Sequence, residues 1–109
     1  MTLGEWLDRR EPSAPPELLA GIKGVLGDDL RLDATDGAAI LLTAAERKLR
    51  TLVTGGETGR VIADDLLVID ALTTYAMEAA TDALTSLSAA ADDAMRRIGA
   101  ISPEERPGS

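Results

Sequence analysis

The chain of 109 residues contains no cysteine, no histidine and no phenylalanine. Without cysteine, a disulfide framework, a thiol nucleophile and a thiolate metal site are all excluded. Without histidine, the commonest general base and the commonest zinc ligand are missing, which excludes Ser-His-Asp and Cys-His catalytic sites. We therefore expect neither a cofactor nor a metal ion, and we expect that the protein is not an enzyme.

Aromatic residues and long apolar runs are also scarce. Trp6 and Tyr75 are the only aromatic residues, so platforms for stacking nucleic-acid bases are nearly absent. The longest strictly apolar runs, Ala38–Leu42 and Leu66–Ile69, are far shorter than the roughly 20 residues of a membrane span. The N-terminus has no basic region ahead of an apolar core, so we do not expect it to be a signal peptide. We expect a soluble cytoplasmic protein with no nucleic-acid or membrane partner.

The residues that are abundant favour an all-α fold. Alanine and leucine dominate the apolar composition, and both are strong helix formers. A chain of this length is typical of a single domain, which we place at residues 1–101. The polar stretch at residues 102–109 has nothing to bury, and we expect a disordered tail there.

Local signals predict two helices in the N-terminal third. Thr2 and Glu5 have the spacing of a capping box, which predicts a short helix. Trp6 lies in this helix, and we expect its ring to pack against the rest of the fold. The proline-rich segment 11–16 ends this helix. A second helix is expected over Pro16–Leu26, because proline suits the first turn and a glycine follows the last apolar residue.

Two glycines and a polar segment complete this part of the chain. Gly21 and Gly24 each weaken the second helix by up to about 1 kcal/mol relative to alanine, but they allow another backbone to approach closely. The segment 28–33 is polar and is expected to be a loop, although Leu30 and Leu32 alternate as in a strand. No second strand is evident to pair with it.

The C-terminal two thirds predict a helical hairpin. Apolar residues spaced by three and four indicate a helix over Asp36–Thr54, which ends at Gly55-Gly56. A second helix starts near Arg60 and meets neither glycine nor proline before Gly99. With the medium and the short N-terminal helices packed on it, the hairpin forms a three- to four-helix bundle.

The two hairpin helices have unequal lengths. About 40 residues span about 60 Å, whereas the preceding helix of about 19 residues spans only about 30 Å. Either the long helix breaks near Ser86 and folds back, or its far end is covered by something else. We favour a continuous helix, because no glycine or asparagine interrupts it and Asp82 would lie unfavourably at the end of a first half.

A continuous helix predicts a homodimer. Apolar residues step by four and three along the helix, as in a coiled coil, and are rich in alanine towards the C-terminus. We expect a non-catalytic helical interaction module that dimerises through the seam Ala76–Ile101. The candidate interface residues are Tyr75, Ala76, Ala80, Ala83, Leu87, Ala90, Ala94 and Ile98. The alternative is a monomeric bundle that binds a small apolar ligand or regulates a basic partner.

The distribution of acidic residues is the reason for considering a basic partner. The net charge is -8, and seven acidic residues but no basic residue lie between Val61 and Met95. A solvated face explains this pattern best, and a surface for a basic protein is the alternative. A di-metal carboxylate site is disfavoured because it needs histidines. Asp70 lies in an apolar stretch, so we expect an edge position with an ion pair to Arg47 or contact with solvent.

The glycine-rich turn before the long helix invites comparison with a phosphate-binding loop. Gly55–Arg60 places three glycines and an arginine at a helix N-terminus. It lacks the Gly-Lys-Ser/Thr ending of a P-loop and follows a helix instead of a strand. We interpret it as an ordinary connection between two helices.

Overall fold

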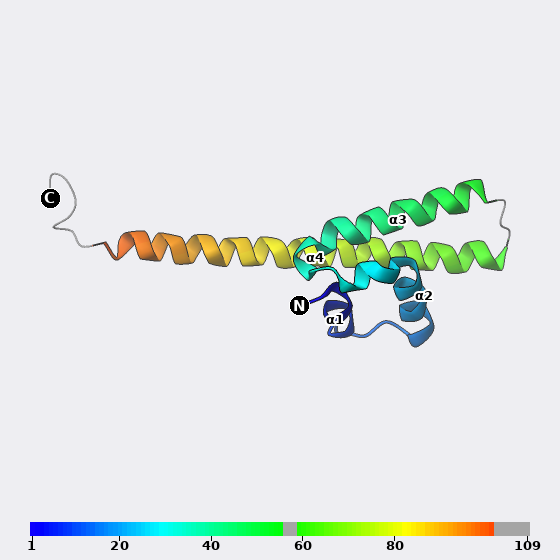
Figure 1. Cartoon of the computed structure of the whole chain (residues 1–109), viewed down its shortest axis with the longest axis horizontal. Coiled ribbons are helices and arrows are strands. Elements are labelled where there is room, and N and C mark those ends of the chain that lie inside the picture. Colours follow the sequence, from blue (N-terminus) through cyan, green and yellow to red (C-terminus); the bar gives the residue numbers. More distant parts are fainter. Residues whose placement is uncertain (56–58, 102–109) are drawn as a thin grey trace.

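The computed structural model describes residues 1–55 and 59–101, which form four α-helices and two short 3-10 helices (Figure 1). The molecule measures 73 × 25 × 22 Å. Its radius of gyration is 20.2 Å, compared with about 13 Å for a compact domain of this size. The all-α class is confirmed. Part of the predicted turn, residues 56–58, and the predicted tail, residues 102–109, lie outside the described residues.

The first helix, α1, covers Leu3–Asp8 and begins with the predicted capping box. The Glu5 backbone N–H donates to the Thr2 hydroxyl at 3.2 Å, and the Thr2 backbone N–H donates to the Glu5 carboxylate at 3.5 Å. Because these bonds satisfy amides that the first turn leaves free, a helix of only six residues has a defined start. Its apolar residues, including Trp6, are buried.

The second helix, α2, covers Pro16–Leu26 as predicted. It stops at Gly27, whose φ of 54° lies in a region that favours glycine. Two 3-10 helices follow, at Gly27–Arg31 and Ala34–Asp36. Most of the loop predicted for residues 28–33 is therefore a 3-10 helix, whose i to i+3 hydrogen bonds form a tight turn after Gly27.

The segment around Leu32 does have a partner. The Leu3 N–H donates to the Leu32 carbonyl at 2.8 Å and the Ala34 N–H donates to the Met1 carbonyl at 3.0 Å, which makes an isolated antiparallel bridge between Thr2 and Asp33. Local patterning missed this pair because the two segments are about 30 residues apart. The bridge places the N-terminus beside the start of the hairpin.

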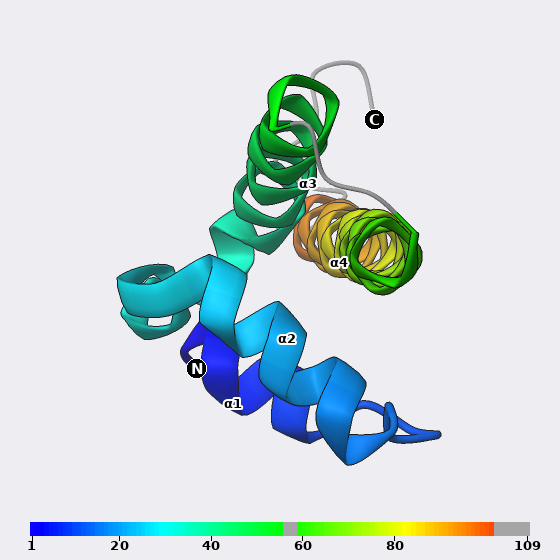
Figure 2. The same cartoon turned by 90° about the vertical axis from the view of Figure 1, so that its right-hand side faces the viewer.

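The hairpin consists of α3, Gly37–Thr54, and α4, Arg60–Gly99. α4 runs through Ser86 without a break, so the continuous helix is confirmed and the alternative chain reversal is wrong. α3 lies along only the first part of α4, and α1 and α2 lie on a neighbouring side of the same part (Figures 1 and 2). The far part of α4 extends beyond the bundle (Figure 1).

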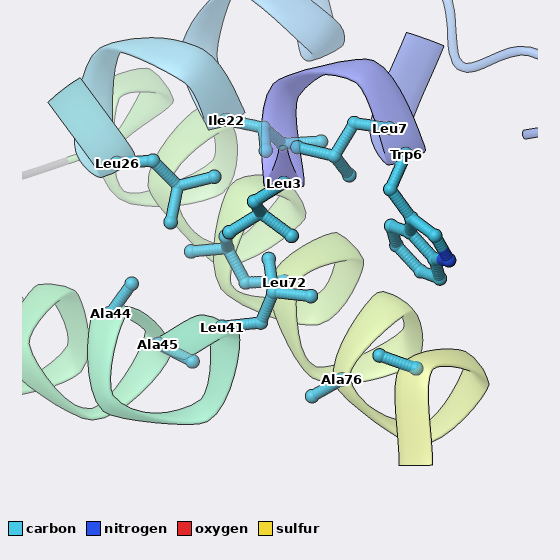
Figure 3. Close-up of a cluster of buried hydrophobic side chains, with 11 residues drawn as sticks. Leu3, Trp6, Leu7, Ile22, Leu26, Leu41, Ala44, Ala45, Leu72 and Ala76 are labelled. Carbon is cyan, nitrogen blue, oxygen red and sulfur yellow. The ribbon is translucent and has the colours of Figure 1, made fainter. Parts of the chain in front are cut away.

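The core is small and lies around the first half of α4. One fully buried leucine or isoleucine comes from each of the four helices: Leu3, Ile22, Leu41 and Leu72 (Figure 3). A Cβ atom on Gly37 would lie 3.3 Å from Leu3 Cδ1, so this glycine lets α1 pack tightly against the start of α3. The last buried residue of α4 is Ala79.

Candidate interaction surface

The bundle ends at a cluster that joins α1 to α4. The Trp6 indole Nε1 donates to Asp82 Oδ2 at 3.0 Å, and the Arg10 guanidinium lies 4.1 Å from the centroid of the Trp6 ring. Arg10 Nη1 also lies 3.4 Å from Asp82 Oδ2. Because Trp6 is buried and its N–H has a charged acceptor, the expectation that it docks onto the bundle is confirmed.

Two of the predicted interface residues belong to this bundle. Tyr75 is half-buried, and its ring meets that of Trp6 edge to face at 6.2 Å between centroids. Ala76 is buried in the core. Tyr75 therefore contacts Trp6 of α1, and Ala76 lies beside Ala38 and Leu42 of α3, so the surface available to a partner begins further along α4.

The remaining part of α4, Ala80–Gly99, is the distal segment. Every residue in it is exposed except Asp93, which is partly covered. Large apolar side chains are among them: Leu84 and Leu87 are each 66% exposed, and Ile98 is 60% exposed. Singly exposed apolar residues are ordinary, but several on one helix face mark an interaction site.

These residues do share one face. Positions spaced by four, three, four, three and four form the distal stripe: Ala80, Leu84, Leu87, Ala91, Ala94 and Ile98. This is the spacing that keeps one side of a helix turned to a partner over many turns. The charged residues Asp92, Asp93, Arg96 and Arg97 lie outside the stripe, and Asp93 pairs with Arg97 at 2.9 Å.

The distal stripe continues the side of α4 that α3 covers. Ala38 and Leu42 of α3 border a shallow apolar groove together with Thr73, Ala76 and Ala80 of α4. From Ala80 the stripe continues by helical spacing to Leu84 and beyond, past the point where α3 begins. The same face is therefore covered by α3 in the first half of α4 and uncovered in the second half.

The predicted interface and the distal stripe overlap in part. Ala80, Leu87, Ala94 and Ile98 of the predicted interface lie on the distal stripe. Ala83 and Ala90 are exposed and lie at one edge of it. Leu84 and Ala91 were not among the predicted residues, although their spacing of four from Ala80 and Leu87 is a signal that could have included them.

The ion pair predicted between Asp70 and Arg47 is not formed, although both residues lie in the described part of the chain. Asp70 is exposed to solvent, which is the other outcome expected for it. Arg47 Nη2 donates instead to the Val25 carbonyl at 3.1 Å and so ties α3 to α2. Among the basic residues of α3, Lys48 pairs with α4: its Nζ lies 3.3 Å from Asp65 Oδ1. The helix packing rotates Lys48 towards α4 and Arg47 towards α2.

Other candidate sites are weaker. Among the seven acidic residues between Val61 and Met95, Asp65, Asp82 and Asp93 already pair with cations of the same chain. Residues 1–55 and 59–101 contain no group of three acidic side chains placed to hold a metal ion. Grooves on the bundle, such as one of about 480 Å³ beside Trp6 and Ala83, are open to solvent.

Within the described residues, no helix combines the length and apolarity needed to cross a membrane. Comparisons with protein-family models, with curated proteins and with solved structures find no match to this chain.

Proposed function

We propose that the protein is a non-catalytic helical interaction module that forms a homodimer through the distal stripe. The observation that carries this proposal is a single apolar face on α4 that α3 covers up to Ala76 and that is exposed from Ala80 to Ile98. Burying a leucine or isoleucine that is mostly exposed removes about 1.5–3 kcal/mol of unfavourable hydration. A second copy supplies an equally long apolar face.

The alternatives have less support. A small apolar ligand is normally held in a concave and largely enclosed site, whereas the grooves described above are open. A basic partner that bound the acidic surface would have to compete with the cations of this chain that already pair with Asp65, Asp82 and Asp93. An uncovered helix face with coiled-coil spacing is best matched by another helix.

Sedimentation equilibrium between about 1 and 100 μM tests the proposal. We expect wild-type protein to approach twice the monomer mass of 11.4 kDa as the concentration rises. Wild-type protein that stays monomeric at 100 μM would rule out the homodimer.

A pair of matched variants locates the interface. Leu87→Glu combined with Ala91→Glu puts two carboxylates in the middle of the distal stripe, and we expect this variant to be monomeric. Thr85→Glu combined with Ala89→Glu adds the same charge at the same spacing on the opposite, exposed side of the helix. We expect the control to dimerise like wild type, and equal dimerisation of the two variants would show that the stripe is not the interface.

A further inference from the structure

We propose that the two copies pair antiparallel, with the two-fold axis level with Ala89, so that each distal segment covers the other from Ala80 to Ile98. This inference rests on the proposed function, because it specifies the direction and register of the same homodimer. Three properties of the chain support it: the position of α3, the order of large and small residues in the distal stripe, and the length of the stripe.

The position of α3 disfavours a parallel pair. The distal stripe lies on the side of α4 that α3 occupies between Thr73 and Ala80. A partner helix that ran parallel along the stripe would continue into the space that α3 fills, because two packed helices lie only about 8–10 Å apart. An antiparallel partner avoids this collision, because its own bundle lies beyond the other end of the distal segment.

The order of residues in the stripe is complementary to its own reverse. From Ala80 to Ile98, the side chains of the stripe are in turn small, large, large, small, small and large. In the antiparallel register, Leu87 faces Ala91 of the partner subunit. Leu84 likewise faces Ala94 of the partner subunit. Ile98 faces Ala80 of the partner subunit, so every layer combines one large side chain with one alanine.

A parallel register would combine like with like. Leucine would then face leucine in two layers and alanine would face alanine in three, which requires the helices to move apart and together along their length. Rigid helices cannot follow such changes over a few turns, and the alanine layers would leave voids. Only the antiparallel order keeps one distance between the helix axes.

The length of the stripe matches the space available. In this register Ala80, beside the start of α3, is level with Ile98 of the partner subunit, and α4 ends one residue later at Gly99. The stretch between the two bundles is therefore filled by the two distal segments. The face of α4 is covered by its own α3 up to Ala76 and, in this register, by the second copy from Ala80 onwards.

Single cysteine variants test the direction, and the absence of natural cysteines leaves no background. Leu84→Cys and Ala94→Cys are made separately, with a size tag on one, and are oxidised alone and as a mixture. A disulfide needs Cα atoms within about 7 Å. In the antiparallel register residue 84 lies about 15 Å along the axis from its own copy, so we expect cross-linked dimer in the mixture and almost none from either variant alone.

The outcomes separate this inference from the proposed function. Cross-linking of each variant with itself would show a parallel dimer and overturn the antiparallel register while leaving the homodimer intact. A dimer by sedimentation that cross-links in neither way would also overturn the register. A protein that sediments as a monomer would remove the homodimer itself. Sedimentation of the reduced variants, with wild-type protein beside them, shows that the substitutions have not prevented association.

Discussion

The cluster of Trp6, Arg10 and Asp82 holds the N-terminal helix at the point where α4 leaves the bundle. Trp6 contributes a buried ring, Arg10 stacks on that ring, and Asp82 accepts a hydrogen bond from the indole N–H. The indole N–H thus has a charged acceptor, and the Asp82 carboxylate has the Arg10 guanidinium as its counterion. These three residues thereby mark the boundary between the covered and the uncovered parts of α4.

Two glycines of α2 differ in their surroundings and supply a matched test of packing. A Cβ atom on Gly21 would lie 3.0 Å from Val68 Cγ2, whereas a Cβ atom on Gly24 would meet nothing within 4 Å. At Gly21 the close neighbour is a side chain and not the backbone that the sequence suggested, and at Gly24 there is no close neighbour. Glycine is otherwise unfavourable inside a helix by about 0.5–1 kcal/mol relative to alanine.

We predict that Gly24→Ala raises the free energy of unfolding by about 0.5–1 kcal/mol, because it improves helix propensity without a new contact. Gly21→Ala should gain less or become destabilising, because Val68 must move to make room. Urea denaturation of both variants measures the difference. Equal stabilisation by the two substitutions would show that α2 does not pack on α4 as closely as described.

At the scale of the element, α4 is one helix in two environments. Its first half is packed by α3 and by the N-terminal helices, and its core residue Leu72 is fully buried. Its second half has helical hydrogen bonds but almost no contact with the rest of the chain. Since a helix without tertiary packing is only marginally stable in water, the stability of the second half depends on whether a partner covers it.

We predict that hydrogen exchange reports this difference and its dependence on concentration. At micromolar concentrations, amides near Leu87 should exchange at least tenfold faster than amides near Leu72, because the uncovered half frays independently. At high concentration the amides near Leu87 should become protected while those near Leu72 change little. Strong protection of both halves at every concentration would show that the distal segment is stable without a partner.

At the scale of the whole molecule, the shape follows from one length ratio. α3 has 18 residues and α4 has 40, so α3 can cover less than half of the length of α4. The result is a bundle with a projecting rod and an extent of 73 Å. A molecule of this mass that extends so far presents a large helix surface to its surroundings.

Small-angle X-ray scattering should distinguish the arrangements of two such molecules. In the antiparallel dimer the two bundles lie at opposite ends, and we predict a maximum dimension of about 90–100 Å, since the two rods overlap over only about 28 Å. A dimer with both bundles at one end would stay close to the 73 Å of the single chain. A dimer whose maximum dimension does not increase would contradict the antiparallel arrangement.

Much of the fold could be predicted because its signals are local. The capping box at Thr2 and Glu5, the start at Pro16 and the stop at Gly27 act within a few residues, and the structure reproduces the helices that they indicate. The uninterrupted run from Arg60 to Gly99 likewise predicts one long helix. Most of the distal stripe followed from the same helical spacing.

The tertiary structure alone decided which side chains meet across the fold. The rotation of α3 about its axis turns Lys48 towards α4 and Arg47 away from it. The rotation of α4 in turn places Asp65, and not Asp70, beside Lys48. The docking of α1 joins residues 76 positions apart and takes Tyr75 and Ala76 into the bundle. Such contacts depend on crossing angles and offsets set jointly by all the packed side chains, whereas helix boundaries depend on neighbours along the chain.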